Sequence, residues 1–214
     1  MTDQSPLLQE KSALIIIDLQ YDFLPKCRNM RRDGALAVPG GNEVIHPISV
    51  LANQFDNVIL TQDWHPNNHK SLVSNHPGKS PFDTIETSYG PQVLWPDHCV
   101  QGTPGADLAI DPWTFDAATM IIRKGTNPDV DSYSAFMEND AKTLTGLGGY
   151  LRDRGIEHLF MAGLATDYCV AYSALDARKM GFNVFLYEHA CRGIDPKTVE
   201  QQCKAMKDAG VTFI

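Results

Sequence analysis

Six short apolar runs dominate the hydrophobic pattern of the chain. They do not alternate with polar residues, so the pattern is that of strands buried on both faces, as in a parallel sheet. Polar residues and turn formers bound each run and keep it to strand length. The runs that we expect to be strands are residues 13–17, 58–60, 120–122, 158–162, 184–187 and 211–213.

Helical periodicity fills most of the intervals between these runs. The segment 42–54 carries Val44, Ile45, Ile48 and Leu51 on one face, although Pro47 implies a kink or a late start. Asp195-Pro196 is typical of an N-cap followed by a first helical residue. Glycine follows three segments and would end their helices. The expected helices are 42–54, 144–154, 168–180 and 196–209.

Strand and helix in repetition predict an α/β fold with a doubly wound, mainly parallel sheet flanked by helices. We expect residues 1–214 to form a single domain. Residues 65–116 are rich in proline and show little periodicity. Because this stretch is too long for a plain connection, we interpret it as a functional lobe that includes a metal-binding loop region.

Charge and composition narrow the classes of function. The 214 residues carry a net charge of −8, which argues against a nucleic-acid surface. Residues 1–11 are polar and no apolar run approaches the roughly 20 residues that span a bilayer, so we expect a cytoplasmic protein without a signal peptide or membrane segment. The five cysteines are widely spaced and are expected to be free thiols.

Reactive residue types follow the predicted strands where each strand ends. In an open parallel sheet, ligands bind beyond the carboxyl ends of the strands. Asp18, Lys124 and Cys169 are placed there by the pattern. A thiol attacks as the thiolate, which a helix start and a nearby ammonium would stabilise, while a carboxylate could accept its proton. This combination favours a cysteine nucleophile over an inert buried cysteine.

A second group of residues suits a metal. Asp63 and His65 follow the second apolar run, and residues i and i+2 of an extended chain point to the same side. A third ligand is needed, and the candidates are His69, His76 and His98. One carboxylate with two histidines suits a single divalent ion, with zinc preferred and iron or manganese as alternatives.

With these residues in place, the chain resembles the nicotinamidases of the isochorismatase-like cysteine hydrolase superfamily. Seven motifs in the family's order extend over nearly the whole chain, which makes the resemblance specific. One departure is a basic insertion, residues 26–33, which we interpret as a solvated loop. The motifs are Asp18-Leu-Gln-Tyr-Asp-Phe23, Ala35-Leu-Ala-Val-Pro-Gly-Gly41, Asp63-Trp-His-Pro66, Trp95-Pro-Asp-His98, Lys124-Gly125, Asp131-Ser-Tyr-Ser-Ala-Phe136 and Gly163-Leu-Ala-Thr-Asp-Tyr-Cys-Val170.

The resemblance implies hydrolysis of nicotinamide to nicotinate and ammonia through a cysteine thioester, in NAD salvage. It also implies a cis peptide between Leu164 and Ala165. The protein could form a homo-oligomer, but the sequence does not determine its oligomeric state. The site residues that it implies are a triad of Asp18, Lys124 and Cys169, metal ligands Asp63, His65 and His98, an oxyanion hole from the N–H groups of Ala165 and Cys169, and a substrate pocket of Phe23, Trp95 and Tyr168.

Three other functions compete with this one. A related cysteine amidohydrolase acting on a carbamoyl or ureido substrate would keep the triad without needing the metal ligands. A non-haem iron oxygenase would use two histidines and a carboxylate, but such sites usually sit on all-β barrels. A catalytically inactive scaffold of the same fold is disfavoured by the intact Cys169.

Overall fold

The computed structural model describes residues 11–26 and 31–214 and is built around one six-stranded parallel sheet. All six predicted runs form its strands, and the predicted fold class is confirmed. The order across the sheet is β5-β2-β1-β6-β7-β8. The strands are β1 (Ser12–Ile17), β2 (Val58–Asp63), β5 (Ala118–Lys124), β6 (His158–Leu164), β7 (Asn183–Arg192) and β8 (Thr212–Phe213).

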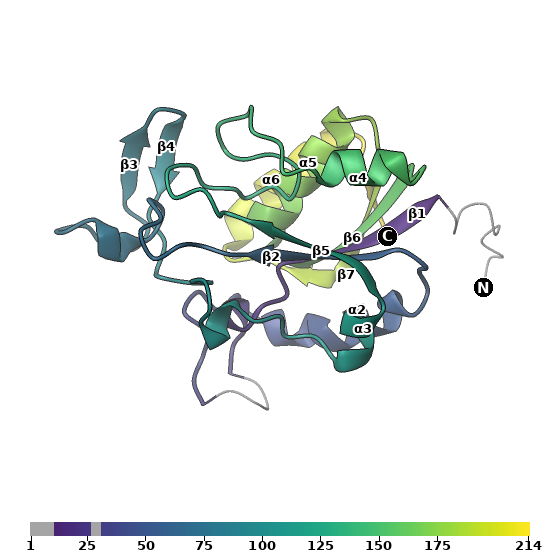
Figure 1. Ribbon diagram of the computed structural model, residues 1–214, viewed down its shortest axis with the longest axis horizontal. Helices are drawn as coiled ribbons and strands as arrows, with labels where there is room; N and C mark the ends of the chain where they lie inside the picture. The colour runs from purple at the N-terminus through teal and green to yellow at the C-terminus, as the bar shows by residue number, and fades with distance from the viewer. Residues whose placement is uncertain (1–10, 27–30) are drawn as a thin grey trace.

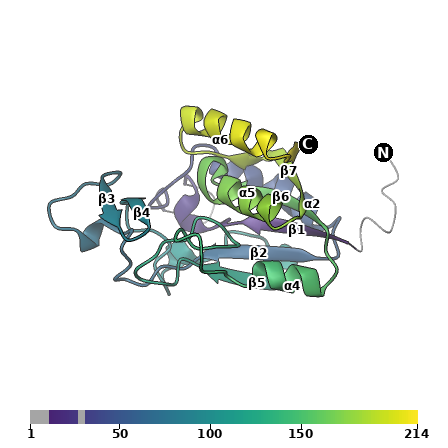
Figure 2. The same ribbon diagram turned by 90° about the horizontal axis from the view of Figure 1, so that it is seen from above.

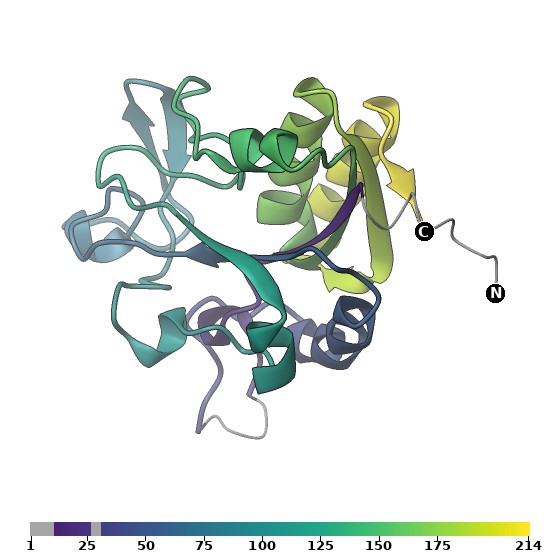
Figure 3. The ribbon, with the colours of Figure 1, turned by 45° about the vertical axis from the view of Figure 1, so that its right-hand side comes forward.

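Helices cover both faces of the sheet, which explains why the central strands are apolar on both sides. The helices α4 (Leu147–Asp153), α5 (Ala171–Lys179) and α6 (Pro196–Asp208) lie on one face, and α2 (Ile45–Ala52) and α3 (Pro112–Asp116) lie on the other (Figures 1 and 3). Every residue of β1 is buried. Ile15 packs in the core on the α4–α6 side, and Ile16 packs in the core on the α2 side.

The helix boundaries differ from the predicted ones for local reasons. A 3₁₀ turn, η2 (Gly41–Val44), precedes α2, so Pro47 falls in the first turn, where its missing N–H costs no hydrogen bond. The predicted helix 144–154 shortens to α4. The predicted helix 168–180 divides into a π-helical turn, η5 (Thr166–Val170), and α5. Asp195 caps α6 as predicted, accepting hydrogen bonds from the N–H groups of Lys197 and Thr198.

The proline-rich stretch 65–116 contains a two-stranded hairpin that the sequence did not reveal. Its strands β3 (Thr84–Thr87) and β4 (Gly90–Val93) are only four residues long and partly exposed, which leaves no continuous apolar run. The hairpin projects beyond the carboxyl ends of the sheet strands (Figures 1 and 2). The stretch also holds the short turns η3 (Val73–Asn75) and η4 (Pro104–Ala106), while η1 (Tyr21–Phe23) follows β1.

The basic insertion 26–33 lies partly outside the described residues, which omit 27–30. Arg31 and Arg32 are exposed. Together with Asp22 and Asp97, they line a groove on the surface. Leu36, a few residues later, is buried and lines a different pocket. Within residues 11–26 and 31–214, no helix is both long enough and apolar enough to cross a membrane.

Candidate active site

Four neighbouring strands deliver the predicted reactive residues to one edge of the sheet. Asp18 follows β1, Asp63 ends β2, and Lys124 ends β5. Cys169 lies in η5, directly after β6. Since β5, β2, β1 and β6 are adjacent in the sheet, these side chains converge at the edge from which the β3–β4 hairpin projects (Figure 1).

Lys124 is the centre of this convergence. Its Nζ lies 2.8 Å from Asp18 Oδ2 and 2.9 Å from Asp63 Oδ1, and donates hydrogen bonds to the carbonyl of Ser132 at 2.9 Å and to Cys169 Sγ at 3.4 Å. All of these side chains are buried. A lysine can be kept charged without water only when it is paired in this way. The pKa of Lys124 is raised well above its ordinary value, because the attraction of Asp18 and Asp63 outweighs the opposing effect of burial.

Asp18 is held in one orientation by its neighbour on β2. Thr61 Oγ1 donates a hydrogen bond to Asp18 Oδ1 at 2.5 Å and accepts one from the Asp18 N–H at 3.0 Å. The backbone of Asp18 has φ +44°, a left-handed conformation that is uncommon outside glycine. Burial raises the pKa of Asp18, helped by Asp63 and opposed by Lys124. The carboxyl group therefore has a proton affinity suited to a base.

Burial and three charged neighbours act on the Cys169 thiol. Burial raises the pKa of the Cys169 thiol well above its ordinary value; Lys124 lowers it, and Asp18 and Asp63 raise it further. A hydrogen bond between Cys169 and the Asp18 side chain also favours the protonated thiol. Lys124 is thus the group that favours the thiolate, and Asp18 is in place to remove the thiol proton.

The loop that presents Cys169 requires close backbone approaches. Gly163 has φ +131°, and a Cβ at this position would lie 2.1 Å from the carbonyl oxygen of Ile17, so only glycine fits where β6 passes β1. The Leu164–Ala165 peptide is cis, as predicted. The Ala165 carbonyl then accepts hydrogen bonds from the N–H groups of Tyr168 and Val170, both at 3.1 Å, and so starts the π-helical turn that holds Cys169.

Asp63, His65 and His98 meet as a buried group with the spacing of metal ligands. Asp63 Oδ2 lies 3.2 Å from His65 Nε2 and 3.5 Å from His98 Nε2. The opposite ring nitrogens are engaged by backbone carbonyls: Nδ1 of His65 by Gly125 at 3.0 Å and Nδ1 of His98 by Pro96 at 2.8 Å. A proton on Nδ1 leaves the Nε2 lone pair free for a metal, so the donor set fits a divalent ion.

Gly125 makes this arrangement possible. Its φ is +64°, and a Cβ here would lie 2.5 Å from Cε1 and 2.7 Å from Nδ1 of the His65 ring. Asp63 also acts on the charge of His65. Although burial lowers it, the pKa of His65 is raised to about 9 by the charge and hydrogen bond of Asp63. A bound metal would replace the proton on Nε2 of His65.

Of the other two histidines considered as ligands, only His69 lies near the metal group. His69, His65 and Asp131 form a second set with ligand spacing, and the Nε2 atom of His69 is buried without a hydrogen-bond partner. The other nitrogen, Nδ1, lies 2.7 Å from Ser71 Oγ. His76 contacts the carbonyl of Lys70 instead and belongs to neither set.

A narrow pocket opens over Cys169 and contains all three predicted aromatics. The Trp95 and Tyr168 rings meet edge to face at 4.8 Å, and Phe23 lies against the His98 ring. Four further residues of the wall were not predicted, although three of them lie in motifs that carried the resemblance, one in Ala35–Gly41 and two in Asp131–Phe136. The missed residues are Leu36, Asp131, Tyr133 and Ile194.

Hydrogen bonds from the hairpin hold part of this wall. Gln92 of β4 is buried, and its Nε2 donates to Asp131 Oδ2 at 2.9 Å and to the Tyr133 hydroxyl at 3.3 Å. The Trp95 indole N–H donates to the same hydroxyl at 3.2 Å. The hairpin thus connects to the pocket wall through the Gln92 amide and through Tyr89, whose hydroxyl accepts a hydrogen bond from the Asp131 N–H at 3.4 Å.

Comparisons with known proteins identify the family of the chain. Residues 12–214 match the isochorismatase domain family. The chain is 52% identical over 185 residues to a nicotinamidase of Acinetobacter baylyi, covering 86% of this chain and 82% of that one. The solved structure of an Acinetobacter baumanii nicotinamidase and pyrazinamidase superposes with a TM-score of 0.90 at 48% identity, covering 99% and 97% of the two chains. A Pyrococcus horikoshii pyrazinamidase in complex with zinc gives a TM-score of 0.75 at 35% identity, covering 95% and 98%.

Proposed function

The chain belongs to the isochorismatase family, and we propose that it is a nicotinamidase that hydrolyses nicotinamide to nicotinate and ammonia in NAD salvage. The observation that carries this proposal is the position of Lys124, within 3.4 Å of Cys169 Sγ and 2.8 Å of Asp18 Oδ2. A nucleophile, a base and a buried cation are thereby brought within reach of one another beneath an aromatic pocket.

In the first half of the reaction, Asp18 removes the Cys169 proton and the thiolate attacks the carboxamide carbon. Lys124 stabilises the negative charge on sulfur. The N–H groups of Ala165 and Cys169 donate to the oxygen of the tetrahedral intermediate, a kind of interaction worth about 2.7–4 kcal/mol in catalysis. The C–N bond then breaks, and Asp18 returns its proton to the leaving nitrogen, which departs as ammonia.

In the second half, water attacks the thioester that joins Cys169 to the nicotinoyl group. Asp18 takes a proton from the water, and the same two N–H groups stabilise the second tetrahedral intermediate. The C–S bond breaks as Asp18 returns this proton to Cys169, and the carboxylic acid so formed loses its own proton to solvent and leaves as nicotinate. The flat walls of Phe23, Trp95 and Tyr168 orient the pyridine ring throughout.

We further propose that Asp63, His65 and His98 hold one divalent metal ion, with zinc preferred and iron or manganese as alternatives. When bound, the ion supplies a Lewis acid for the pyridine nitrogen. The carbonyls of Gly125 and Pro96 support this role by fixing the ring nitrogens of the two histidines. We also propose that residues 1–214 form one domain in which the region 65–116 completes the metal site.

The alternative, an amidohydrolase for carbamoyl or ureido substrates, explains the triad and the pairing of Asp63 with Lys124, but it gives no role to His65 and His98. The test measures ammonia release by the purified protein from nicotinamide and from benzamide, which lacks the ring nitrogen. We expect rapid release from nicotinamide, slow release from benzamide, and no release by Cys169→Ala. Equal turnover of the two amides, or full activity after metal removal, would favour the alternative.

A further inference from the structure

One partner of the Lys124 ammonium neither reacts nor belongs to the metal group. This partner is the carbonyl oxygen of Ser132, which lies 2.9 Å from Nζ, as near as the carboxylate oxygens of Asp18 and Asp63. An ammonium has three protons to share among its acceptors. A neutral carbonyl holds one of them only while the distance and angle of the hydrogen bond stay favourable, so its contribution depends on where residue 132 is placed.

Asp131 holds Ser132 in place from the preceding position. Its Oδ1 accepts a hydrogen bond from the Ser132 N–H at 2.8 Å, and its own carbonyl accepts one from the Asn139 N–H at 2.7 Å. The Ser132 hydroxyl donates to the carbonyl of Ser134 at 2.9 Å and so stiffens the same turn. Asp131 and Ser132 are both buried. The direction of the Ser132 carbonyl therefore depends on where the Asp131 carboxylate lies.

Two residues of the β3–β4 hairpin fix Asp131. The Nε2 atom of Gln92 donates to Asp131 Oδ2 at 2.9 Å and to the carbonyl of Val93 at 2.8 Å. Tyr89, in the turn between the two strands, donates its hydroxyl proton to Gln92 Oε1 at 3.1 Å and accepts the Asp131 N–H at 3.4 Å. The reverse orientation of the amide would place Oε1 against two acceptors, so these contacts determine which way the amide faces.

We propose that Gln92 is a positioning residue for catalysis, which acts through Asp131 and Ser132 on Lys124, and that Tyr89 fixes the direction of its amide. The path from Gln92 to Lys124 consists of hydrogen bonds of 2.9, 2.8 and 2.9 Å. Its four residues are buried, so water does not readily replace a lost partner. The inference rests on the proposed function, because that function gives the Lys124 ammonium its role in the reaction.

Gln92 also contacts the wall of the substrate pocket, but more weakly. Its Nε2 lies 3.3 Å from the Tyr133 hydroxyl, which accepts a second hydrogen bond from the Trp95 indole at 3.2 Å. An amide nitrogen has two protons, and the shorter contacts with Asp131 and Val93 have the first claim on them. We therefore expect the loss of Gln92 to lower kcat more than it raises KM. A residue that only supported the pocket wall would show the opposite pattern.

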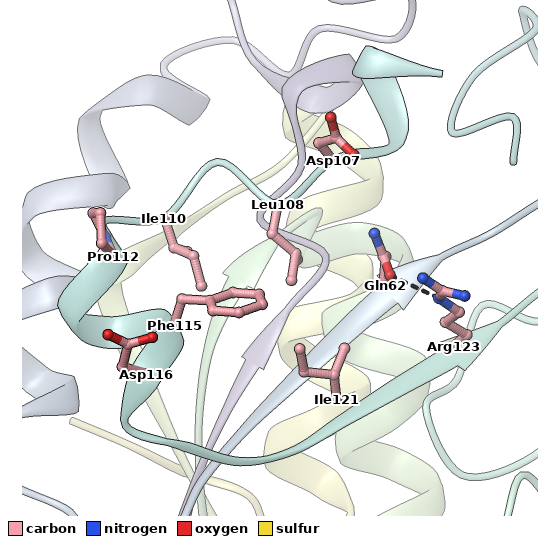
Figure 4. A pocket seen from close by; sticks show the side chains of 9 residues that line it. All are labelled: Gln62, Asp107, Leu108, Ile110, Pro112, Phe115, Asp116, Ile121 and Arg123. Atoms are coloured by element: carbon pink, nitrogen blue, oxygen red, sulfur yellow. Dashed lines mark hydrogen bonds between the residues drawn. The ribbon is translucent and has the colours of Figure 1, made fainter. Parts of the chain in front are cut away.

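Gln62 of β2 provides a matched control. It is buried like Gln92, its Nε2 donates to the carbonyl of Ala106 at 2.8 Å, and its Oε1 accepts a hydrogen bond from Arg123 Nε at 3.1 Å. Gln62 and Arg123 line a surface groove between α3 and β5, where Figure 4 shows the bond that joins them. Gln62 thus holds the cation that precedes Lys124 on β5. Among the described residues, neither of its two partners belongs to the path from Gln92.

The first experiment compares Gln92→Leu with Gln62→Leu in two assays, ammonia release from nicotinamide and alkylation of Cys169 by iodoacetamide at neutral pH. Gln92→Leu should lower kcat by about tenfold, raise KM by a smaller factor and slow alkylation by about threefold or more. Gln62→Leu should keep all three values near those of the wild type, even where its thermal midpoint falls as far. Unchanged kcat and alkylation in a folded Gln92→Leu, or equal losses in the two variants, would overturn the proposal. Alkylation needs no nicotinamide, so it tests the path even if the wild type releases no ammonia and the proposed function fails.

Tyr89→Phe is the milder variant and keeps the test possible if Gln92→Leu does not fold. It removes one hydroxyl from a partly exposed ring and should lower kcat by about threefold, with KM near the wild-type value. A folded Tyr89→Phe with wild-type kcat would contradict the proposal. Where both variants fold, the double variant should alkylate no more slowly than Gln92→Leu alone, because both changes act through Asp131. Independent effects would multiply instead, and a double variant that showed the product of the two losses would rule out a shared path.

Discussion

Replacing Lys124 with methionine should damage both stability and activity, and the structure gives the size of each effect. Methionine keeps most of the stem and removes the ammonium group. In the wild type that group lies within 2.9 Å of two buried carboxylates, Asp18 and Asp63. Breaking a buried ion pair by removing one partner typically costs about 3–5 kcal/mol, because the remaining charge is left without compensation. Two carboxylates share this cation, so we expect a loss of free energy of unfolding at or above that range.

The catalytic loss has a separate origin. Burial already raises the pKa of the Cys169 thiol, and Lys124 is the main group that lowers it. Without the cation, the thiolate that attacks the amide forms in an apolar site beside two carboxylates. The removal of one group that stabilises developing charge commonly lowers kcat by about 10²–10³-fold. We expect kcat/KM of Lys124→Met to fall by at least this factor.

Ammonia release from nicotinamide measures kcat/KM, and urea denaturation measures the free energy of unfolding. Lys204→Met is the matched control, because Lys204 pairs with Asp208 at 2.6 Å while 77% of its side chain is exposed. An exposed pair of this kind contributes only about 0.2–1 kcal/mol, so both measurements should stay close to the wild type. Asp18→Asn, which keeps Lys124 and nearly the same volume, probes the triad if Lys124→Met does not fold.

The result that would refute this reasoning is a small effect on a folded variant. If kcat/KM of Lys124→Met fell by less than about tenfold, equivalent to roughly 1.4 kcal/mol, the cation would not be stabilising the nucleophile. If its free energy of unfolding matched that of Lys204→Met, the two carboxylates would not be ionised together in the folded protein.

Three further predictions concern single contacts of the site. Cys169→Ala should abolish ammonia release, and its thermal midpoint should stay near that of Cys203→Ala. The Cys203→Ala control should remain active. Ammonia release by Cys169→Ala would show that Cys169 is not the nucleophile. His98→Ala should lower the metal content, measured by elemental analysis, more than His69→Ala does. Full metal occupancy in His98→Ala would mean that His69, and not His98, is the third ligand. Thr61→Val deletes the 2.5 Å hydrogen bond to Asp18 and should lower kcat by about tenfold or more, with recovery in Thr61→Ser; equal rates for the two variants would show that the hydroxyl does not position the base.

The strand-end residues could be predicted because one rule of parallel sheets places them together. Asp18, Asp63 and Lys124 each stand at the carboxyl end of an apolar run, and the order of runs in the sheet does not alter the edge at which they meet. The third metal-ligand position could not be fixed in this way. His69 and His98 both lie in the irregular stretch after β2, where no periodicity determines which ring turns toward Asp63.

The rest of the pocket wall depends on loop packing, which no hydrophobic periodicity in the sequence reveals. Leu36 and Ile194 lie far apart along the chain and outside every strand of the sheet, yet both line the pocket that contains Cys169. Gln92 reaches Asp131 and Tyr133 from a four-residue strand that alternates too briefly to be seen. A buried amide of this kind is recognisable only from its partners, since its sequence context resembles that of a solvated glutamine.

The metal group and the nucleophile share one carboxylate and therefore act as a single electrostatic unit. One oxygen of Asp63 faces Lys124 and the other faces His65 and His98. The negative charge of Asp63 raises the pKa of Cys169, and a dication on its outer oxygen would offset that charge. Metal removal should consequently slow the alkylation of Cys169 by iodoacetamide at neutral pH. It should also weaken the binding of nicotinamide. An alkylation rate that is the same with and without metal would show that Lys124 screens the two halves of the site from each other, and the triad could then be treated without reference to the ion.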